Sequence, residues 1–130
     1  MSQKLHCYPK SILVVDDEEG VLDLLRAVLN NAGYNVECAQ NGIEGLQLFR
    51  SRDWDAVISD RMMPEMNGEE MATQMRALRA NVPILLLTGA PGRVENPQLF
   101  DTIMAKPFRL TELLDQVSQL TRSTACSEPV

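Results

Sequence analysis

The sequence predicts an α/β fold in which a five-stranded parallel sheet is covered by helices on both faces. Short apolar runs such as "ILVV" and "PILLL" recur along the chain, and they are typical of strands buried on both sides. Longer segments with apolar residues at helical spacing lie between most of these runs. Because strands that alternate with helices are joined by crossovers, the strands are expected to run parallel.

The first half of the chain is predicted to supply three strands and two helices. The run "SILVVD" is expected to be a central strand, "YNVECA" an edge strand because its apolar residues alternate, and "DAVIS" another buried strand. A helix is predicted in "EEGVLDLLRAVLNNAGY", ending near Gly33, and a shorter one in "NGIEGLQLFRSR". The residues expected on their buried faces are Val21, Leu24, Leu25, Val28 and Leu29 in the first and Ile43, Leu46 and Phe49 in the second.

The second half is predicted to hold a third helix, two strands and a closing helix. Asn67 is a candidate N-cap of the third helix, with Glu69 and Glu70 in its first turn. The runs "VPILLLT" and "TIMAK" are expected to be strands, but "GAPGRVENPQ" between them carries two prolines and two glycines. A helix there should be shortened, displaced or largely lost, with at most a turn or two in "PQLFDT". The residues expected on buried helix faces are Met71, Met75, Leu78, Leu110, Leu113, Leu114, Val117 and Leu120.

The length of 130 residues fits a single domain. Its core is expected over residues 11–122, with an irregular lead-in at 1–10 and a flexible tail at 123–130. The longest apolar runs have only strand length, so neither a signal peptide nor a membrane span is predicted. The tail is too short for a DNA-binding or catalytic effector, so output is expected through protein contacts or from a larger protein of which this chain is a part.

Charge and cysteine content exclude several classes of function. The net charge is -6 and the sequence pI is near 4.7, which argues against binding nucleic acid or an anionic membrane. The three cysteines, Cys7, Cys38 and Cys126, lie far apart and form no C-x-x-C pair. They therefore predict neither a disulfide framework nor a zinc site, and a reduced cytoplasmic setting fits them best.

Candidate functional residues stand where the predicted strands end. Asp16 and Asp17 follow the first strand, Asp60 ends the third, Thr88 the fourth, and Lys106 the fifth. These carboxyl ends meet at one edge of a doubly wound sheet. Three ionised carboxylates that lie so near one another require a cation. Their oxygen atoms are the ligands that Mg²⁺ prefers. Asp60 could then act as a nucleophile toward a phosphoryl group. Lys106 would supply a positive charge and Thr88 a hydroxyl donor to the phosphoryl oxygens.

Four motifs, "VVDDEE", "SDRMMPEMNG", "LLLTGA" and "AKPF", together resemble the receiver domain of two-component response regulators. The resemblance runs from about residue 11 to 122 and implies a flavodoxin-like sheet of strand order 2-1-3-4-5. It also implies a regulatory, cytoplasmic phosphoprotein rather than an enzyme. Asp60 would be the phospho-acceptor, taking phosphate from a histidine kinase or phosphotransfer protein, and Thr88 the switch hydroxyl.

The same resemblance assigns roles to the other site residues. It implies that Asp17 binds Mg²⁺ directly and that Asp16 does so largely through water. It implies that the backbone carbonyl of Met62 completes the metal site and that Lys106 pairs with the phosphoryl group. The bond before Pro107 is expected to be cis, as it is in this family. An unknown downstream protein is the expected output partner, with no direct contact to nucleic acid or membrane.

One residue departs from the family pattern, and three charged residues near the predicted site are not assigned to it. Ile103 stands where the family usually has an aromatic residue, so a phosphorylation-driven change is predicted in the "TGAPGRVE" loop and Thr88. Glu18 and Glu19 are interpreted as acids that favour a helix start. Arg61 is interpreted as a solvated charge that could touch an incoming partner.

Three other functions remain as alternatives. A degenerate receiver could bind proteins independently of phosphorylation, and the altered fourth segment keeps this possibility open. An aspartate-nucleophile phosphatase typically carries D-x-D after its first strand, whereas the acids here are adjacent. A flavodoxin-like FMN binder would need a glycine- and hydroxyl-rich loop there, because acidic side chains repel the phosphate.

Overall fold

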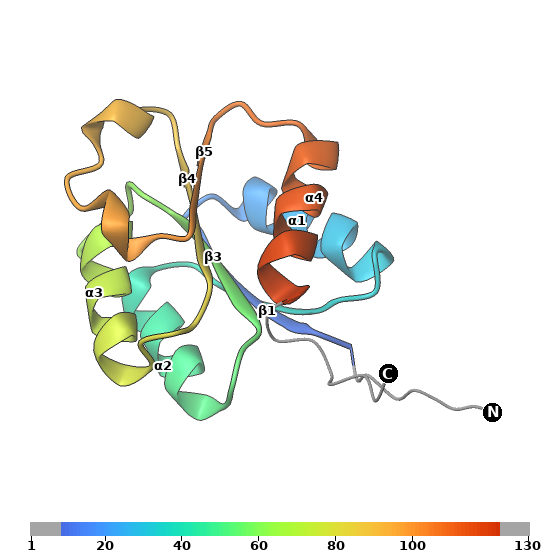
Figure 1. The fold of residues 1–130 in the computed structure, drawn as a ribbon, viewed down its shortest axis with the longest axis horizontal. Helices are drawn as coiled ribbons and strands as arrows, with labels where there is room; N and C mark the ends of the chain where they lie inside the picture. Colours follow the sequence, from blue (N-terminus) through green and yellow to red (C-terminus); the bar gives the residue numbers. More distant parts are fainter. Residues whose placement is uncertain (1–8, 123–130) are drawn as a thin grey trace.

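The computed structural model describes residues 9–122; the lead-in before residue 9 and the predicted tail at 123–130 lie outside the described residues. Five parallel strands form one sheet in the order β2-β1-β3-β4-β5, which confirms the predicted fold and strand order (Figure 1). The strands are β1 Ser11–Val15, β2 Asn35–Ala39, β3 Ala56–Asp60, β4 Ile84–Thr88 and β5 Thr102–Ala105.

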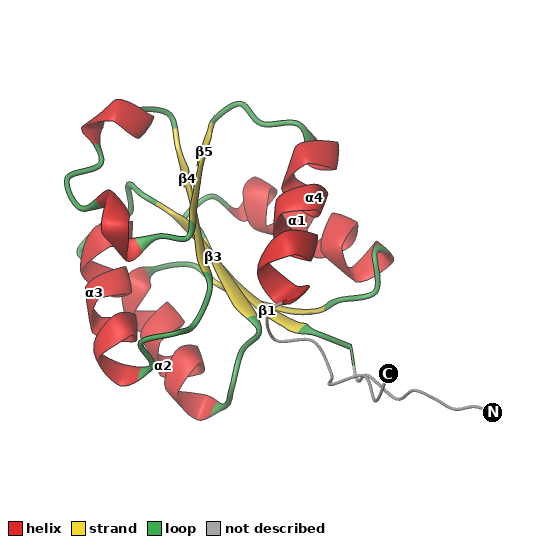
Figure 2. Ribbon diagram, in the orientation of Figure 1, coloured by secondary structure: helices red, strands yellow, loops and turns green. Residues whose placement is uncertain are grey.

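Helices cover both faces of the sheet (Figure 2). Helices α1 and α4 pack on one face, and α2 and α3 on the other. Their bounds are α1 Glu19–Asn31, α2 Gly42–Ser51, α3 Gly68–Leu78 and α4 Leu110–Arg122. None of the described helices is long and apolar enough to cross a membrane.

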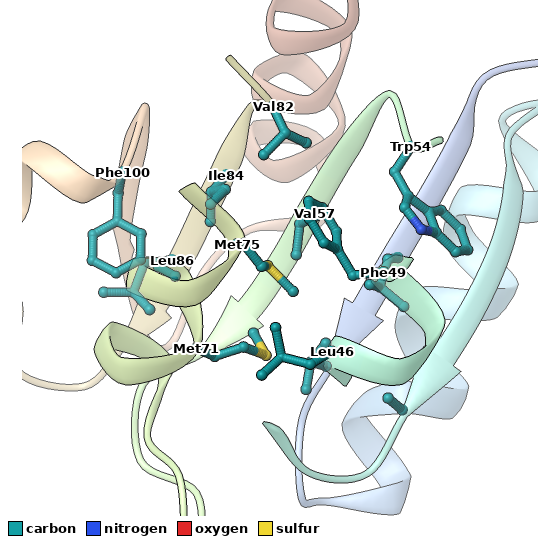
Figure 3. Close-up of a cluster of buried hydrophobic side chains, with 14 of the residues drawn as sticks. Leu46, Phe49, Trp54, Val57, Met71, Met75, Val82, Ile84, Leu86 and Phe100 are labelled. Atoms are coloured by element: carbon teal, nitrogen blue, oxygen red, sulfur yellow. The ribbon is translucent and has the colours of Figure 1, made fainter. Parts of the chain in front are cut away.

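Each face of the sheet has its own apolar core. Alternate residues of β1 point to opposite sides, so Leu13 joins the cluster under α2 and α3, and Val14 the one under α1 and α4. Figure 3 shows the first cluster, in which Met71 and Met75 of α3 lie among side chains from the strands and α2. Burial of each such side chain stabilises the fold by roughly 1.5–3 kcal/mol, and together they hold the strand ends in register.

The buried stripes of the helices are narrower than the apolar pattern predicts. Leu24, Ile43 and Leu78 were expected in the core, but 44%, 48% and 48% of their surfaces are exposed. In α1 the predicted Leu25 and Leu29 are buried, and Leu22, which was not predicted, is the third buried position. A helix that lies on a flat sheet buries residues at alternating steps of three and four, and the apolar residues beside that stripe stay in solvent.

The fourth family helix is lost as predicted, although one of the two turns that remain lies at residues 91–93, before the predicted "PQLFDT" segment. The connection between β4 and β5 forms two single 3₁₀ turns, η1 Pro91–Arg93 and η2 Pro97–Leu99, and each begins with a proline. Proline fits the first position of a turn but not the interior of a helix. The connection therefore satisfies few of its backbone groups internally.

Arg76 of α3 holds the end of this connection. Its guanidinium donates to the carbonyl oxygen of Leu99 at 2.8 and 3.0 Å and to Asp101 Oδ2 at 2.9 Å. It also donates to the carbonyl oxygens of Ala80, at 2.9 Å, and of Val82. One arginine thus joins the segment before β4 to the segment before β5.

Candidate functional site

Three carboxylates meet where β1 and β3 end. The two strands pair side by side, with Val15 opposite Ser59, so the residues that follow lie next to each other. Asp16, Asp17 and Asp60 each offer an oxygen, and these oxygens lie within 4.8 Å of one another. Asp16 and Asp60 are buried and Asp17 is exposed, so the cluster opens to solvent on one side.

Asp16 has a buried oxygen with no hydrogen-bond partner among the described residues. Its Oδ1 accepts the backbone N–H of Glu18 at 2.9 Å, whereas its Oδ2 accepts no hydrogen bond within the described residues and has only the Lys106 amine nearby, at 3.6 Å. Burial raises the pKa of Asp16 to about 6, the Glu18 N–H opposes that rise, and the neighbouring Asp60 charge adds to it. A buried, charged oxygen without a donor is costly unless a cation lies beside it.

Lys106 stands on the other side of Asp60. Its Nζ donates to Asp60 Oδ1 at 2.9 Å and lies 3.6 Å from Asp16 Oδ2. Burial by itself would lower the pKa of Lys106, but the hydrogen bond to Asp60 and the charges of Asp16 and Asp60 raise it overall. The Lys106–Pro107 peptide bond is cis. Lys106 therefore remains a cation that is fixed against the central carboxylate.

Thr88 completes this edge from the end of β4. It is buried, lies one strand away from Asp60, and its Oγ1 accepts the backbone N–H of Ala90 at 3.0 Å. The N–H of Lys106 donates to the Thr88 carbonyl oxygen at 2.8 Å, which ties the last two strands together above the site. Thr88 and Lys106 therefore reach the same edge as the acids.

A hollow of about 320 Å³ opens over these residues. Met62 lies at this hollow with 66% of its surface exposed, and Glu18, which was left outside the predicted site, also lines it. The complete lining is Asp17, Glu18, Asp60, Arg61, Met62, Thr88, Gly89 and Lys106. The space could admit a small anion beside the carboxylate of Asp60.

The start of α3 approaches the acceptor strand closely. A Cβ at Gly68 would lie 2.5 Å from the carbonyl oxygen of Asp60, and the Gly68 N–H donates to the Arg61 carbonyl at 2.8 Å. Asn67 and Glu70 form a reciprocal capping box with bonds of 2.8 and 2.9 Å, which confirms the predicted N-cap. Glycine at position 68 is needed because any side chain would collide with the backbone of β3.

The interpretation of Arg61 as a solvated charge was wrong. Only 17% of its side chain is exposed, and its Nε lies 3.2 Å from Glu69 Oε2. Its Nη2 donates to the carbonyl oxygen of Arg93 at 3.0 Å. The sequence contains no short-range signal for this pair, because the two residues come together only through the turn that precedes α3.

The residues of the acidic edge fit Mg²⁺. They provide several oxygen ligands, an exposed side for bound water and one buried oxygen that accepts no hydrogen bond within the described residues. Mg²⁺ prefers such a site, with few protein oxygens and several waters. Asp16, Asp17 and Asp60 are the side chains that could hold it.

The comparisons with known proteins identify the family. The model of the response regulator receiver domain matches residues 12–118. The chain belongs to the response regulator receiver domain family. Response regulator MprA of Mycobacterium sp. (strain KMS) is 40% identical over 124 residues, covering 92% of this chain and 54% of that protein. This receiver chain thus spans about half the length of the curated relatives it matches.

Solved receiver structures share the fold of this receiver domain. A CheY-like receiver domain protein from Methanospirillum hungatei aligns with a TM-score of 0.83 at 28% identity, covering 88% of this chain and 95% of that one. Response regulator TrrA from Thermotoga maritima, solved in complex with Mg²⁺-BeF, aligns with a TM-score of 0.80 at 36% identity, covering 85% of this chain and 98% of that one. These likenesses confirm the flavodoxin-like receiver architecture.

Proposed function

We propose that this chain is a phospho-accepting receiver domain, phosphorylated on Asp60 with Mg²⁺ by a histidine kinase or phosphotransfer protein. The main support is the position of one carboxylate between an amine and a cation site. Lys106 Nζ lies 2.9 Å from Asp60 Oδ1 and 3.6 Å from Asp16 Oδ2, which accepts no hydrogen bond within the described residues. Buried polar atoms without a hydrogen bond are uncommon in native proteins, and a bound ion is one explanation for such an atom.

In the proposed reaction, a carboxylate oxygen of Asp60 forms a bond to phosphorus while the bond from phosphorus to the donor nitrogen breaks. Lys106 orients the Asp60 carboxylate and then pairs with the transferred phosphoryl oxygens. Thr88 contributes its hydroxyl to those oxygens from the end of β4. Bound Mg²⁺ would supply the positive charge that neutralises the carboxylates and the phosphoryl group. Asp16, Asp17 and the Met62 carbonyl are proposed to hold the metal.

The proposed role is regulatory and cytoplasmic. Residues 1–130 would act as one receiver domain that signals through phosphorylation-dependent contact with another protein. Direct binding to nucleic acid or membrane is not expected, because the chain carries a net charge of -6.

Mass spectrometry of the intact protein tests this proposal. The protein would be incubated with Mg²⁺ and acetyl phosphate or phosphoramidate, and we expect it to gain the mass of one phosphoryl group. Asp60→Asn should abolish the gain. Asp53→Asn is a matched control, because the Asp53 side chain is fully exposed and makes only a 3.8 Å ion pair with Arg79. If the wild-type protein gains no phosphoryl group from either acetyl phosphate or phosphoramidate, the proposal is contradicted.

One observation favours a second candidate, a binding module that does not use phosphate. Ile103 replaces the usual aromatic residue and packs against the core cluster under α2 and α3, and the helix before it is lost. A receiver without its usual readout could bind a partner in one fixed state. The same mass measurement separates the candidates, since this module would gain no phosphoryl group.

A further inference from the structure

The ion pair between Arg61 and Glu69 organises the segment that replaces the missing helix. The Glu69 carboxylate accepts the backbone N–H of Asn96 at 2.9 Å and that of Glu95 at 3.2 and 3.3 Å. Arg61 Nη2 donates to the carbonyl oxygen of Arg93 at 3.0 Å. Three backbone groups within residues 93–96 are thus satisfied by two side chains from the β3–α3 region.

The surroundings of Glu69 favour its ionised form. Burial alone would raise the pKa of Glu69, but the N–H of Asn96, the guanidinium of Arg61 and the N–H of Glu95 outweigh it and lower the pKa. Hydrogen bonds to an ionised group are about twice as strong as neutral ones. Residues 93–96 therefore depend on the charge and position of this carboxylate.

Arg61 also borders the proposed phosphoryl site. It directly follows the acceptor Asp60 and lines the hollow above it, while on its other side it lines a polar hollow with Glu69, Glu95 and Asn96. Arginine has five N–H donors. Within the described residues, the Nη1 of Arg61 donates only to Met62 Sδ at 3.6 Å, and a thioether sulfur is a weak acceptor. The guanidinium of Arg61 therefore has N–H groups without a strong acceptor within the described residues, next to the proposed anion site.

We propose that Arg61 is a further phosphoryl-binding residue and that Glu69 competes with the phosphoryl group for it, so that occupancy of the site is transmitted to residues 93–96. This inference rests on the proposed phosphorylation of Asp60. A phosphoryl group brings several oxygens into the hollow that Arg61 lines, and guanidinium prefers such oxyanions. As Arg61 turns toward them, it releases the Arg93 carbonyl and leaves Glu69 without its cation.

Thermodynamic linkage makes the competition reciprocal. If an anion in the site weakens the contact between Arg61 and Glu69, then weakening that contact must strengthen binding of the anion. Removing the negative charge of Glu69 should therefore increase anion affinity, whereas removing the guanidinium of Arg61 should decrease it. A purely structural role for the pair predicts instead that both changes impair the site.

Beryllium fluoride with Mg²⁺ is a suitable probe because it mimics a phosphoryl group on a carboxylate. In the wild-type chain, we expect its binding to speed hydrogen exchange at the Glu95 and Asn96 amides by about fivefold or more. Glu69→Gln should bind the probe about fivefold or more tightly, and Arg61→Met should bind it more weakly by a similar factor. Glu70→Gln is the matched control, because Glu70 bonds to Asn67 in the same helical turn, and its affinity should equal that of the wild type.

The possible outcomes separate this inference from the proposed function. Wild-type protein that binds the probe without any change at the two amides would overturn the inference and leave the function intact. Weaker binding in both Glu69→Gln and Arg61→Met would also overturn it. A wild type that does not bind beryllium fluoride would contradict both proposals. The exchange measurement needs no substitution, so it decides the matter even if a variant fails to fold.

Discussion

Two buried carboxylates at the same edge of the sheet have opposite surroundings. Asp16 is 1% exposed and Glu69 is 8% exposed. One oxygen of Asp16 has no hydrogen-bond partner among the described residues, and burial raises its pKa to about 6. Both oxygens of Glu69 accept N–H donors, and these bonds lower its pKa despite burial.

The contrast separates a buried carboxylate with too few hydrogen-bond donors from one with a full set. A buried charge with too few donors reduces stability, and such groups are common at functional sites. A buried charge with a full set of donors stabilises the segment that supplies them. Four predictions follow from this contrast, and the first has the largest expected effect.

Asp16→Asn is expected to stabilise the metal-free protein by on the order of 2 kcal/mol at pH 7. The change removes a buried charge but keeps the oxygen that accepts the Glu18 N–H. Urea unfolding without divalent ions measures this effect. Asp17→Asn should change stability much less, because Asp17 is exposed. A loss of stability in Asp16→Asn would show that the Glu18 N–H and Lys106 compensate the buried charge of Asp16 fully.

Glu69→Gln is expected to destabilise the protein by about 1.5 kcal/mol, the size of a hydrogen bond to a charged group. Glutamine keeps one acceptor but loses the charge that faces Arg61 and the two backbone N–H groups. Urea unfolding in the same buffer gives the comparison with Asp16→Asn. If both substitutions shift stability in the same direction, the proposed difference between the two carboxylates is wrong.

The effect of Glu69→Gln should depend on pH. Because the pKa of Glu69 is lower in the folded protein than its ordinary value of 4.5, its contribution to stability is complete above that value. The contribution is lost as the pH falls through the folded pKa. The difference in unfolding free energy between wild type and Glu69→Gln should therefore shrink below about pH 4.5. A difference that stays constant down to pH 3 would argue against an ionised Glu69.

Glu70→Gln should have the smallest effect, within about 0.5 kcal/mol. Glu70 is exposed, and its side chain accepts the N–H of Asn67, which glutamine can also do. Thermal unfolding compared with Glu69→Gln measures the difference between two adjacent acids in one helical turn. Equal losses in the two variants would show that the contacts of Glu69 with Arg61 and residues 95–96 add no more stability than the capping box of Glu70 does.

Local patterns of sequence were sufficient for the strands and for their functional ends. Each buried strand is a short apolar run, and Asp16, Asp60, Thr88 and Lys106 stand beside those runs. Parallel connections then place strand ends at one edge, so these side chains could be expected together. The prolines and glycines after Thr88 likewise predicted the loss of a helix, because they disfavour helical backbone locally.

The sequence by itself therefore determined the layered fold, the acidic edge and the missing helix, since each depends on residue type and spacing within short segments. Only the tertiary structure decided that Leu24 and Ile43 stay in solvent, because the width of a buried stripe depends on the surface beneath it. Only the tertiary structure also paired Arg61 with Glu69 and joined both to residues 93–96. The contacts with residues 93–96 span more than twenty residues of sequence, and no local pattern marks them. Two acidic side chains thus acquired different surroundings, since the fold brought three N–H donors to Glu69 and left one oxygen of Asp16 without a hydrogen bond within the described residues.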